Sequence, residues 1–426
     1  MSLEPLEDFR ERVRAFLRAE VGPARARSTA GLRNLGDDED DLREVQRDRE
    51  LQRLFHDAGL AGIVVPTEYG GQGLTPEHQQ VLNEELVGYD SPVRNQVPTM
   101  TPCMAVLLDF GTEEQKRTHV PAILRGEELW MQLLSEPGGG SDVAGASTTA
   151  IRDGDEWVLN GSKVWTTGAW WSDWGLCLAR TNWDVPKHRG LTVFMVPIDA
   201  EGIEVQRIEM LNGNREFCQE YLTDVRVPDS HRIGELDDGW TVGLRWMFHE
   251  RMAANSPYVT RPAEMELAAV DGQSIRRVAL DAGRADDPVA QELVGEAEVL
   301  ALVGSALGRR VAEGMAAGTM TEQASAIARL YHGLSVARRT TIAFELARSA
   351  GIAWSDADGA LAGVGDDFLM RQVSCIGGGT TEMAANVVSE RVLGMPREPS
   401  RDRDRPFRDV PRGGSRTSWA ERRGSA

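Results

Sequence analysis

Hydrophobic positions in the first 125 residues follow a helical period. Leu6, Phe9, Val13 and Phe16 recur every three or four residues, which places them on one face of a helix. Two more helical patterns follow at residues 51–58 and 76–87. Between them, the apolar run 59–66 is interrupted by glycine and proline, which indicates a buried turn. Residues 28–44 are polar and acidic, so we expect a loop there. The pattern predicts an N-terminal helical domain over residues 1–125.

The hydrophobic period changes to two between residues 128 and 234. Asn160-Gly161 stands between the apolar segments 156–159 and 162–165, and this dipeptide favours a tight hairpin. Consecutive strands without helices between them indicate an antiparallel sheet or barrel. We therefore expect an antiparallel β-barrel-like middle domain over residues 126–236. Its other predicted strands cover residues 175–179, 191–197, 203–208 and 218–227.

Helical patterns return after Trp240. The last of them stops at Gly394, with Pro396 just beyond, as is typical of a helix end. Helices, then a sheet, then helices again correspond to an α+β protein with a C-terminal helical bundle over residues 237–396. The predicted helices of this region cover residues 241–254, 289–317, 322–350 and 381–393.

Composition narrows the class of protein. With 426 residues, 41% of them hydrophobic and 27% charged, the chain resembles soluble globular proteins. It has no apolar stretch of about 18 residues and no apolar N-terminal signal, so we expect neither a membrane span nor secretion. The net charge of −19 argues against nucleic-acid binding. The four cysteines form no Cys-x-x-Cys pair, so we expect no metal site and a reducing, cytoplasmic location.

The segment after Pro396 is rich in arginine. Six arginines lie between residues 397 and 412. A run of this kind is typical of a solvated chain end, so we expect residues 397–426 to form a disordered tail. Contact with a partner or a phosphate group is the alternative interpretation.

One glycine-rich stretch carries the most specific pattern. Residues 135–142 read Ser-Glu-Pro-Gly-Gly-Gly-Ser-Asp. Glycine lets a backbone pass close to a ligand, and the serine hydroxyls can donate and accept hydrogen bonds. No Gly-Lys-Ser/Thr follows, and the surroundings are strands, so neither a P-loop nor a dinucleotide-binding turn fits. On composition alone, a plain glycine-rich loop remains the alternative.

This stretch resembles the signature of the acyl-CoA dehydrogenase family. Further similarities to the family, in the same order, cover residues 66–74, 111–116, 160–167 and 377–394. The resemblance spans roughly residues 5–398. It implies a helical N-terminal domain, a β-barrel-like middle domain and a C-terminal four-helix bundle. It also implies FAD-dependent α,β-dehydrogenation of an acyl-CoA substrate, with electrons passed to an electron-transfer flavoprotein.

The resemblance assigns the residues that contact the cofactor. Without it, Trp165 could equally be part of the barrel core, and Glu382 could be an acidic residue in the first turn of a helix. The implied FAD-binding residues are Gln132, Leu134, Ser135, Gly140, Ser141, Trp165, Thr167, Thr380 and Glu382.

The base takes an unusual place in this sequence. Many family members carry a glutamate directly before a Gly-Thr pair near the C-terminus, but this chain has Gly378 there. Other members place the glutamate on a helix directly before an arginine, which here corresponds to Glu250 and Arg251. The resemblance therefore implies Glu250 as catalytic base, with a surface glutamate paired with arginine as the alternative. It implies that Ser141, Arg251 and Gly378 bind substrate. His249 would point to another side of the helix.

Two departures concern the subunit interface. The family's Arg-x-x-Phe-Gly element is absent, and residues 283–288 read Gly-Arg-Ala-Asp-Asp-Pro. Residues 347–351 replace its Gln-x-x-Gly-Gly element. We expect a homo-oligomer, either dimer or tetramer, or a hetero-tetramer with a second acyl-CoA dehydrogenase-like chain. A non-catalytic or half-site subunit is one alternative function, and an acyl-CoA oxidase or flavin monooxygenase is another. The pattern does not define the acyl chain.

Overall fold

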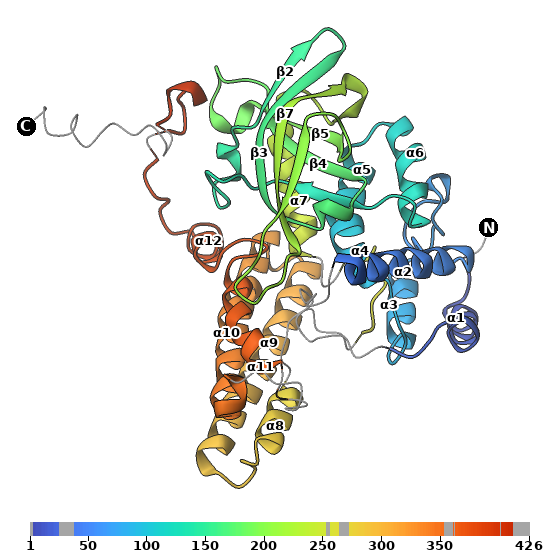
Figure 1. The fold of residues 1–426 in the computed structure, drawn as a ribbon, viewed down its shortest axis with the longest axis vertical. Coiled ribbons are helices and arrows are strands. Elements are labelled where there is room, and N and C mark those ends of the chain that lie inside the picture. Colours follow the sequence, from blue (N-terminus) through green and yellow to red (C-terminus); the bar gives the residue numbers. More distant parts are fainter. Residues whose placement is uncertain are drawn as a thin grey trace, which may run out of the picture.

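A helical N-terminal region, a β-sheet and a long helical bundle follow one another in the computed structural model (Figure 1). The structure describes residues 3–24, 38–252, 256–263, 272–352, 361, 363–400 and 402–411. Within them, no helix is long and apolar enough to cross a membrane. No group of histidine, cysteine and acidic side chains in these ranges could hold a metal ion.

The N-terminal region is helical, as predicted. Its second helix already begins at Asp38, so the expected loop over residues 28–44 is wrong for 38–44, while 28–37 lie outside the described ranges. Four acidic residues in the first turn of this helix suit the positive end of its dipole. The α-helices are α1 (Leu6–Glu20), α2 (Asp38–Asp57), α3 (Pro76–Glu85), α4 (Val93–Pro98), α5 (Ala105–Phe110) and α6 (Glu113–Leu124).

The middle region contains one eight-stranded sheet in the order β6-β7-β3-β2-β4-β5-β8, with β1 paired to β4. Pairing is antiparallel, as expected, except that β1–β4 and β2–β4 are parallel. The strands are β1 (Trp130–Leu133), β2 (Thr149–Asp153), β3 (Glu156–Thr167), β4 (Trp174–Arg180), β5 (Leu191–Pro197), β6 (Ile203–Arg207), β7 (Phe217–Pro228) and β8 (Arg232–Ile233).

The hairpin predicted at Asn160-Gly161 is wrong. Strand β3 runs straight through this dipeptide, and the register against β7 shifts there. A side chain at Gly161 would come within 2.8 Å of Thr148, so glycine allows a close approach of two backbones. Asn160 bonds Asp224 across the strands instead of turning the chain. The hairpin lies earlier, at Gly154, between β2 and β3.

The C-terminal helices divide into two groups. Helix α7 (Gly239–Arg251) packs on β5 and on the helices of the N-terminal region. The other helices form a separate bundle with its own apolar core, which extends away from the sheet (Figure 1). These are α8 (Gly272–Asp281), α9 (Pro288–Ala316), α10 (Ser325–Ala347), α11 (Val364–Met370) and α12 (Thr381–Val387).

The last described segment, residues 402–411, lies against the middle domain (Figure 1). Phe407 is buried and stacks on Trp183. The expectation of a disordered tail is therefore wrong for this segment, because an aromatic anchor stabilises it despite its many charges. The expectation for residues 412–426 falls outside the described ranges.

Candidate functional site

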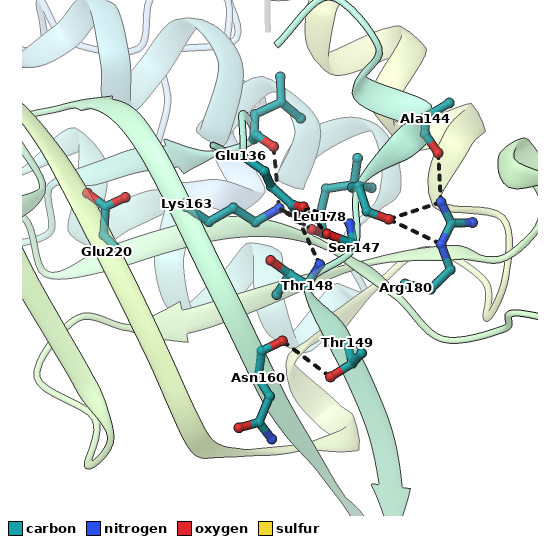
Figure 2. Close-up of polar contacts among 12 residues, drawn as sticks. Glu136, Ala144, Ser147, Thr148, Thr149, Asn160, Lys163, Leu178, Arg180 and Glu220 are labelled. Atoms are coloured by element: carbon teal, nitrogen blue, oxygen red, sulfur yellow. Dashed lines mark hydrogen bonds and ion pairs between the residues drawn. The ribbon is translucent and has the colours of Figure 1, made fainter. Parts of the chain in front are cut away.

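A buried ion pair holds the glycine-rich loop, which covers residues 134–148 between β1 and β2. Lys163 Nζ lies 2.9 Å from Glu136 Oε1 and also donates to the carbonyl oxygen of Leu178 at 2.7 Å (Figure 2). Glu136 accepts further hydrogen bonds from the backbone amides of Ser147 and Thr148. Burial opposes ionisation, but Lys163 and these donors outweigh it and lower the pKa of Glu136 to about 2. The ion pair therefore ties both ends of the loop to strand β3.

The end of β1 lies beside β3. Val164 donates its backbone N–H to the carbonyl oxygen of Ser135 at 3.0 Å, and the backbone oxygen of Leu134 accepts from Lys163. A side chain at Gly140 would meet only Ser135 Oγ, at 3.7 Å. Ser141 is exposed at the tip of the loop. Ser135 and the open backbone at Gly140 thus lie beside the strand that carries Trp165.

Trp165 presents its ring to solvent from a strained backbone. It is the extra residue of a bulge between Val164 and Thr166, its φ is 65°, and 58% of its surface is exposed. A bulky residue in the left-handed region costs free energy and marks functional sites. The alternative of a barrel-core tryptophan does not hold. The exposed indole, with Thr167 two residues further along β3, suits a flat aromatic cofactor such as FAD.

Helix α7 is bonded to the first flavin strand. Trp246 Nε1 donates a hydrogen bond to Gln132 Oε1, and the Trp246 ring is completely buried. Glu250 lies one turn further along α7, on the same face of the helix. This face therefore looks toward the strand that contains Gln132.

Glu250 sits in surroundings that disfavour its charge. It is partly buried, and removal from water raises its pKa, while Arg251 and Arg329 act in the opposite direction. It is close enough to the buried thiol of Cys103 to affect the pKa of that group. Among the described residues, no hydrogen bond or ion pair engages the Glu250 carboxylate. A partly desolvated, unengaged carboxylate is suited to accept a proton.

The triple-glycine turn is held by Arg329, whose charge also acts on Glu250. Arg329 on α10 donates to the carbonyl oxygens of Ser374 and Gly377, at 2.8 and 2.7 Å. A side chain at Gly378 would meet only Arg329 Nε, at 4.0 Å. The backbone N–H of Gly378 makes no hydrogen bond within the described chain. The assignment of Gly378 to the substrate stays a prediction.

Thr380 and Glu382 behave as ordinary helix-capping residues. Thr380 Oγ1 accepts the backbone N–H of Met383 at 3.1 Å and caps α12. Glu382 is exposed, and its pKa is lowered by its own backbone N–H, Thr380 and Thr381. No contact in the described ranges joins either residue to Trp165 or Ser135. Their assignment to FAD stays a prediction.

Sequence reasoning missed the residues that hold the site in shape. Glu136 and Lys163 lie inside matched motifs but were not assigned a role. Trp246 and Arg329 lie in helices whose pattern shows only that one face is buried. Of the predicted substrate residues, Arg251 is exposed at the end of α7, next to Glu250.

His249 points away from Glu250. Its Nε2 lies 2.8 Å from Asp109 Oδ2 on α5, and Arg245 Nε binds the same oxygen at 2.7 Å. The expectation that His249 occupies another side of the helix is confirmed. This histidine joins α7 to the N-terminal region.

Comparisons with known proteins identify the family. Residues 4–127 match the model described as "Acyl-CoA dehydrogenase, N-terminal domain", and residues 132–225 match "Acyl-CoA dehydrogenase, middle domain". Acyl-CoA dehydrogenase IpdE1 of Mycobacterium tuberculosis is 31% identical over 93% of this chain and 99% of its own length. Acyl-CoA dehydrogenase FadE34 of the same organism is 33% identical over 82% of this chain, which spans only 47% of that protein.

A solved structure gives the same result. The structure named "Tcur3481-Tcur3483 steroid ACAD" is similar with a TM-score of 0.72 and 28% identity, over 93% of this chain and all of the other. The chain therefore belongs to the acyl-CoA dehydrogenase family, a family of FAD-dependent oxidoreductases that act on CH–CH groups.

Proposed function

We propose that this chain catalyses α,β-dehydrogenation of a CoA thioester, with Glu250 as the base and an electron-transfer flavoprotein as electron acceptor. The observation that carries the proposal is the bond between Trp246 and Gln132. It fixes α7 so that the face bearing Glu250 is turned toward the strand beside Trp165. The partly desolvated carboxylate of Glu250 therefore faces the strands beside Trp165, where the flat ring of FAD would bind.

The chain supplies a base and a hydrogen-bond donor for the reaction. Glu250 takes the proton from the carbon α to the thioester carbonyl, and burial raises its pKa, which makes it a stronger base. The Gly378 N–H stabilises negative charge on the thioester oxygen as that proton leaves. Arg329 holds the turn that carries Gly378 through two carbonyl oxygens. Arg251 and Ser141 bind the CoA part of the substrate.

FAD, when bound, supplies an acceptor for the hydride of the β carbon. Trp165 offers an apolar face to its ring, and Thr167 and Ser135 offer hydroxyl groups beside it. Gln132 and Leu134 line the neighbouring strand, and Gly140 leaves room for a phosphate. These groups are exposed or half-buried in the structure.

Glu250→Gln tests the base. We expect purified variant protein to keep bound FAD but to lose bleaching of the flavin absorbance by an acyl-CoA, by at least about a hundredfold in rate. Glu313→Gln, on the exposed surface of α9, is the matched control and should bleach normally. Normal bleaching by Glu250→Gln would reject Glu250 as the base.

The acyl group is the least defined part of the proposal. The similar solved structure is named a steroid ACAD, so we propose steroid-derived acyl chains as the first substrates to try. A screen of steroid, branched and straight-chain CoA thioesters, followed by flavin bleaching, tests this choice. Faster reoxidation of reduced flavin by air than by an electron-transfer flavoprotein would instead favour an oxidase.

A half-site subunit is the second candidate, and two observations favour it. Arg284, in the segment that replaces the family's Arg-x-x-Phe-Gly element, turns inward and binds Asp287 at 2.6 Å and the carbonyl oxygen of Glu345 at 3.1 Å. Helix α9 also exposes Val299, Leu302 and Val303 on one face. Arg284 is engaged within its own chain and does not reach the cofactor of a neighbouring subunit. The exposed apolar face of α9 is suited to contact a partner chain.

The similar structure's name joins two proteins, so the proposed partner is a second acyl-CoA dehydrogenase-like chain. Expression of this chain alone and with candidate partners separates the two functions. Yellow protein that bleaches with acyl-CoA when expressed alone supports the complete enzyme. Colourless protein that becomes yellow only in a stable complex supports the half-site subunit.

A further inference from the structure

The segment 402–411, here named the C-terminal strap, is attached to the loop between β4 and β5. Phe407 donates its backbone N–H to the carbonyl oxygen of Val185 at 2.9 Å, and Arg408 donates to that of Trp183 at 3.1 Å. The rings of Phe407 and Trp183 stack with centroids 5.3 Å apart. Arg408 also pairs with Asp184. Two backbone bonds, a ring stack and an ion pair make this a defined contact.

One route from the strap to the glycine-rich loop runs through the side chain of Arg180. The guanidinium of Arg180 lies 4.0 Å from the centre of the Phe407 ring. The same guanidinium donates to the carbonyl oxygens of Ala144, at 2.6 Å, and Ala146, at 3.1 Å (Figure 2). Arg180 is completely buried. Phe407 therefore covers the group that holds the second half of the glycine-rich loop.

A further contact joins the β4–β5 loop to the glycine-rich loop. Lys187 Nζ lies 2.7 Å from Asp142 Oδ1, next to Ser141, and the carbonyl oxygen of Lys187 accepts from Arg180 at 2.6 Å. The strap thus braces the β4–β5 loop from outside, and the β4–β5 loop braces the glycine-rich loop. In the strap itself, the charges of Asp402, Asp404 and Asp409 balance those of Arg403, Arg405 and Arg408. The strap therefore acts on the β4–β5 loop through its contacts and not through a net charge.

We propose that the C-terminal strap positions the glycine-rich loop for the CoA part of the substrate. Phe407 acts as a positioning residue through Arg180 and does not touch the reacting atoms. The proposal rests on the function proposed above, because it takes Ser141 as a contact of the CoA thioester. It predicts an effect on the affinity for substrate, and on the affinity for FAD that Gly140 and Ser141 share, without an effect on the chemical step of the FAD-loaded enzyme.

Two truncated chains test the strap. One ends at Ser400 and lacks it, while the matched control ends at Pro411 and keeps it. Hydrogen exchange is measured without substrate, at the amides of Gly145 and Ala146, which bond within the loop. We expect these amides to exchange about tenfold faster in the chain ending at Ser400 than in the control. Strand β7 amides should exchange equally in both.

Substrate binding gives the second measurement. We expect KM for an acyl-CoA, measured with saturating FAD, to rise about tenfold without the strap, while kcat per bound FAD stays within about twofold. Phe407→Ala should reproduce the change in the full chain, and Phe407→Leu should recover part of it. Unchanged exchange at Gly145 and Ala146 overturns the proposal, as does faster exchange with unchanged KM. If no form of the protein uses an acyl-CoA, the proposed function fails, while the exchange experiment still decides whether the strap orders the loop.

Discussion

His249 and Asp109 connect α7 to α5 through a contact of 2.8 Å between Nε2 and Oδ2. His249 is the residue directly before the proposed base, and its ring is almost fully buried. Arg245, one turn earlier on α7, binds the same oxygen of Asp109. Trp246 bonds Gln132 from another face of the helix. Helix α7 is thus fixed on two sides, which restricts rotation of Glu250 about the helix axis.

The bond between Asp109 and His249 should stabilise the fold in a pH-dependent way. Burial raises the pKa of Asp109, but hydrogen bonds from His249 and Arg245 outweigh it and lower that pKa. A carboxyl whose pKa is lowered on folding adds stability above its ordinary pKa, and this stability is lost as pH falls through the lowered value.

We therefore expect Asp109→Asn to reduce the free energy of unfolding by about 1–2 kcal/mol at pH 7 and by less near pH 3. Urea unfolding at both pH values measures this. The exposed pair of Asp153 and Arg226 provides a control, and Asp153→Asn should cost less than about 0.5 kcal/mol. Equal losses for Asp109→Asn at both pH values would contradict the prediction.

Lys163→Met should be strongly destabilising. The substitution leaves the Glu136 carboxylate buried without its cation, which typically costs about 3–5 kcal/mol. Exchanging Glu136 for glutamine in the same chain removes that unpaired charge, so the double variant should recover part of the loss. Thermal unfolding of the two single variants and the double variant gives the coupling between these residues. Additive losses would show that the pair does not act as a unit.

Trp165→Gly should separate stability from cofactor binding. Glycine adopts a φ of 65° without strain, so the protein without FAD should gain up to about 1 kcal/mol of stability. Loss of the exposed indole should weaken FAD binding at least about tenfold. Trp165→Phe keeps a ring and the strain, and should retain most of the affinity. FAD titration and thermal unfolding check both effects, and unchanged affinity of Trp165→Gly would exclude a ring contact.

Glu220 should make stability fall as pH rises. Burial raises its pKa to about 8, although Thr166 donates a hydrogen bond to it at 2.8 Å. Folding therefore favours the protonated form, and stability declines between the ordinary glutamate pKa and about 8, by at most about 1.4 kcal/mol per pH unit.

Glu220→Gln should remove this contribution and flatten the pH dependence between pH 5 and 8. Glu216, whose pKa burial raises to about 7, should keep part of the decline in the variant. Guanidinium unfolding at several pH values measures the difference. The same pH slope in wild type and Glu220→Gln would show that Glu220 is ionised in the folded protein.

Hydrophobic periodicity predicted the order of the elements. A helix or strand that buries one face repeats its apolar residues with a helical or strand period, and this period is visible in a single sequence. The bounds of α9 and β5 show this well. Asn160-Gly161 shows the limit. The dipeptide suits a hairpin turn and a bulge equally, and the choice depends on Thr148 and Asp224, which are distant in sequence.

Motif similarity located both halves of the candidate site but not the bonds between them. The link from Gln132 to Trp246 depends on packing between the sheet and α7, and the position of Arg329 beside Gly378 depends on packing between α10 and the turn before α12. The strap was predicted to be disordered because its charges dominate its composition. A single phenylalanine, Phe407, reverses that outcome through stacking on Trp183.

The apolar face of α9 has a consequence for the thermodynamics of the molecule. Val299, Leu302 and Val303 are exposed in the single chain, and any chain that covers them binds only the folded form. Mass action then makes the melting temperature depend on the concentration of the covering chain. A dilution series would reveal a second copy of this protein by a falling melting temperature, whereas an unlike partner would raise that temperature only when added.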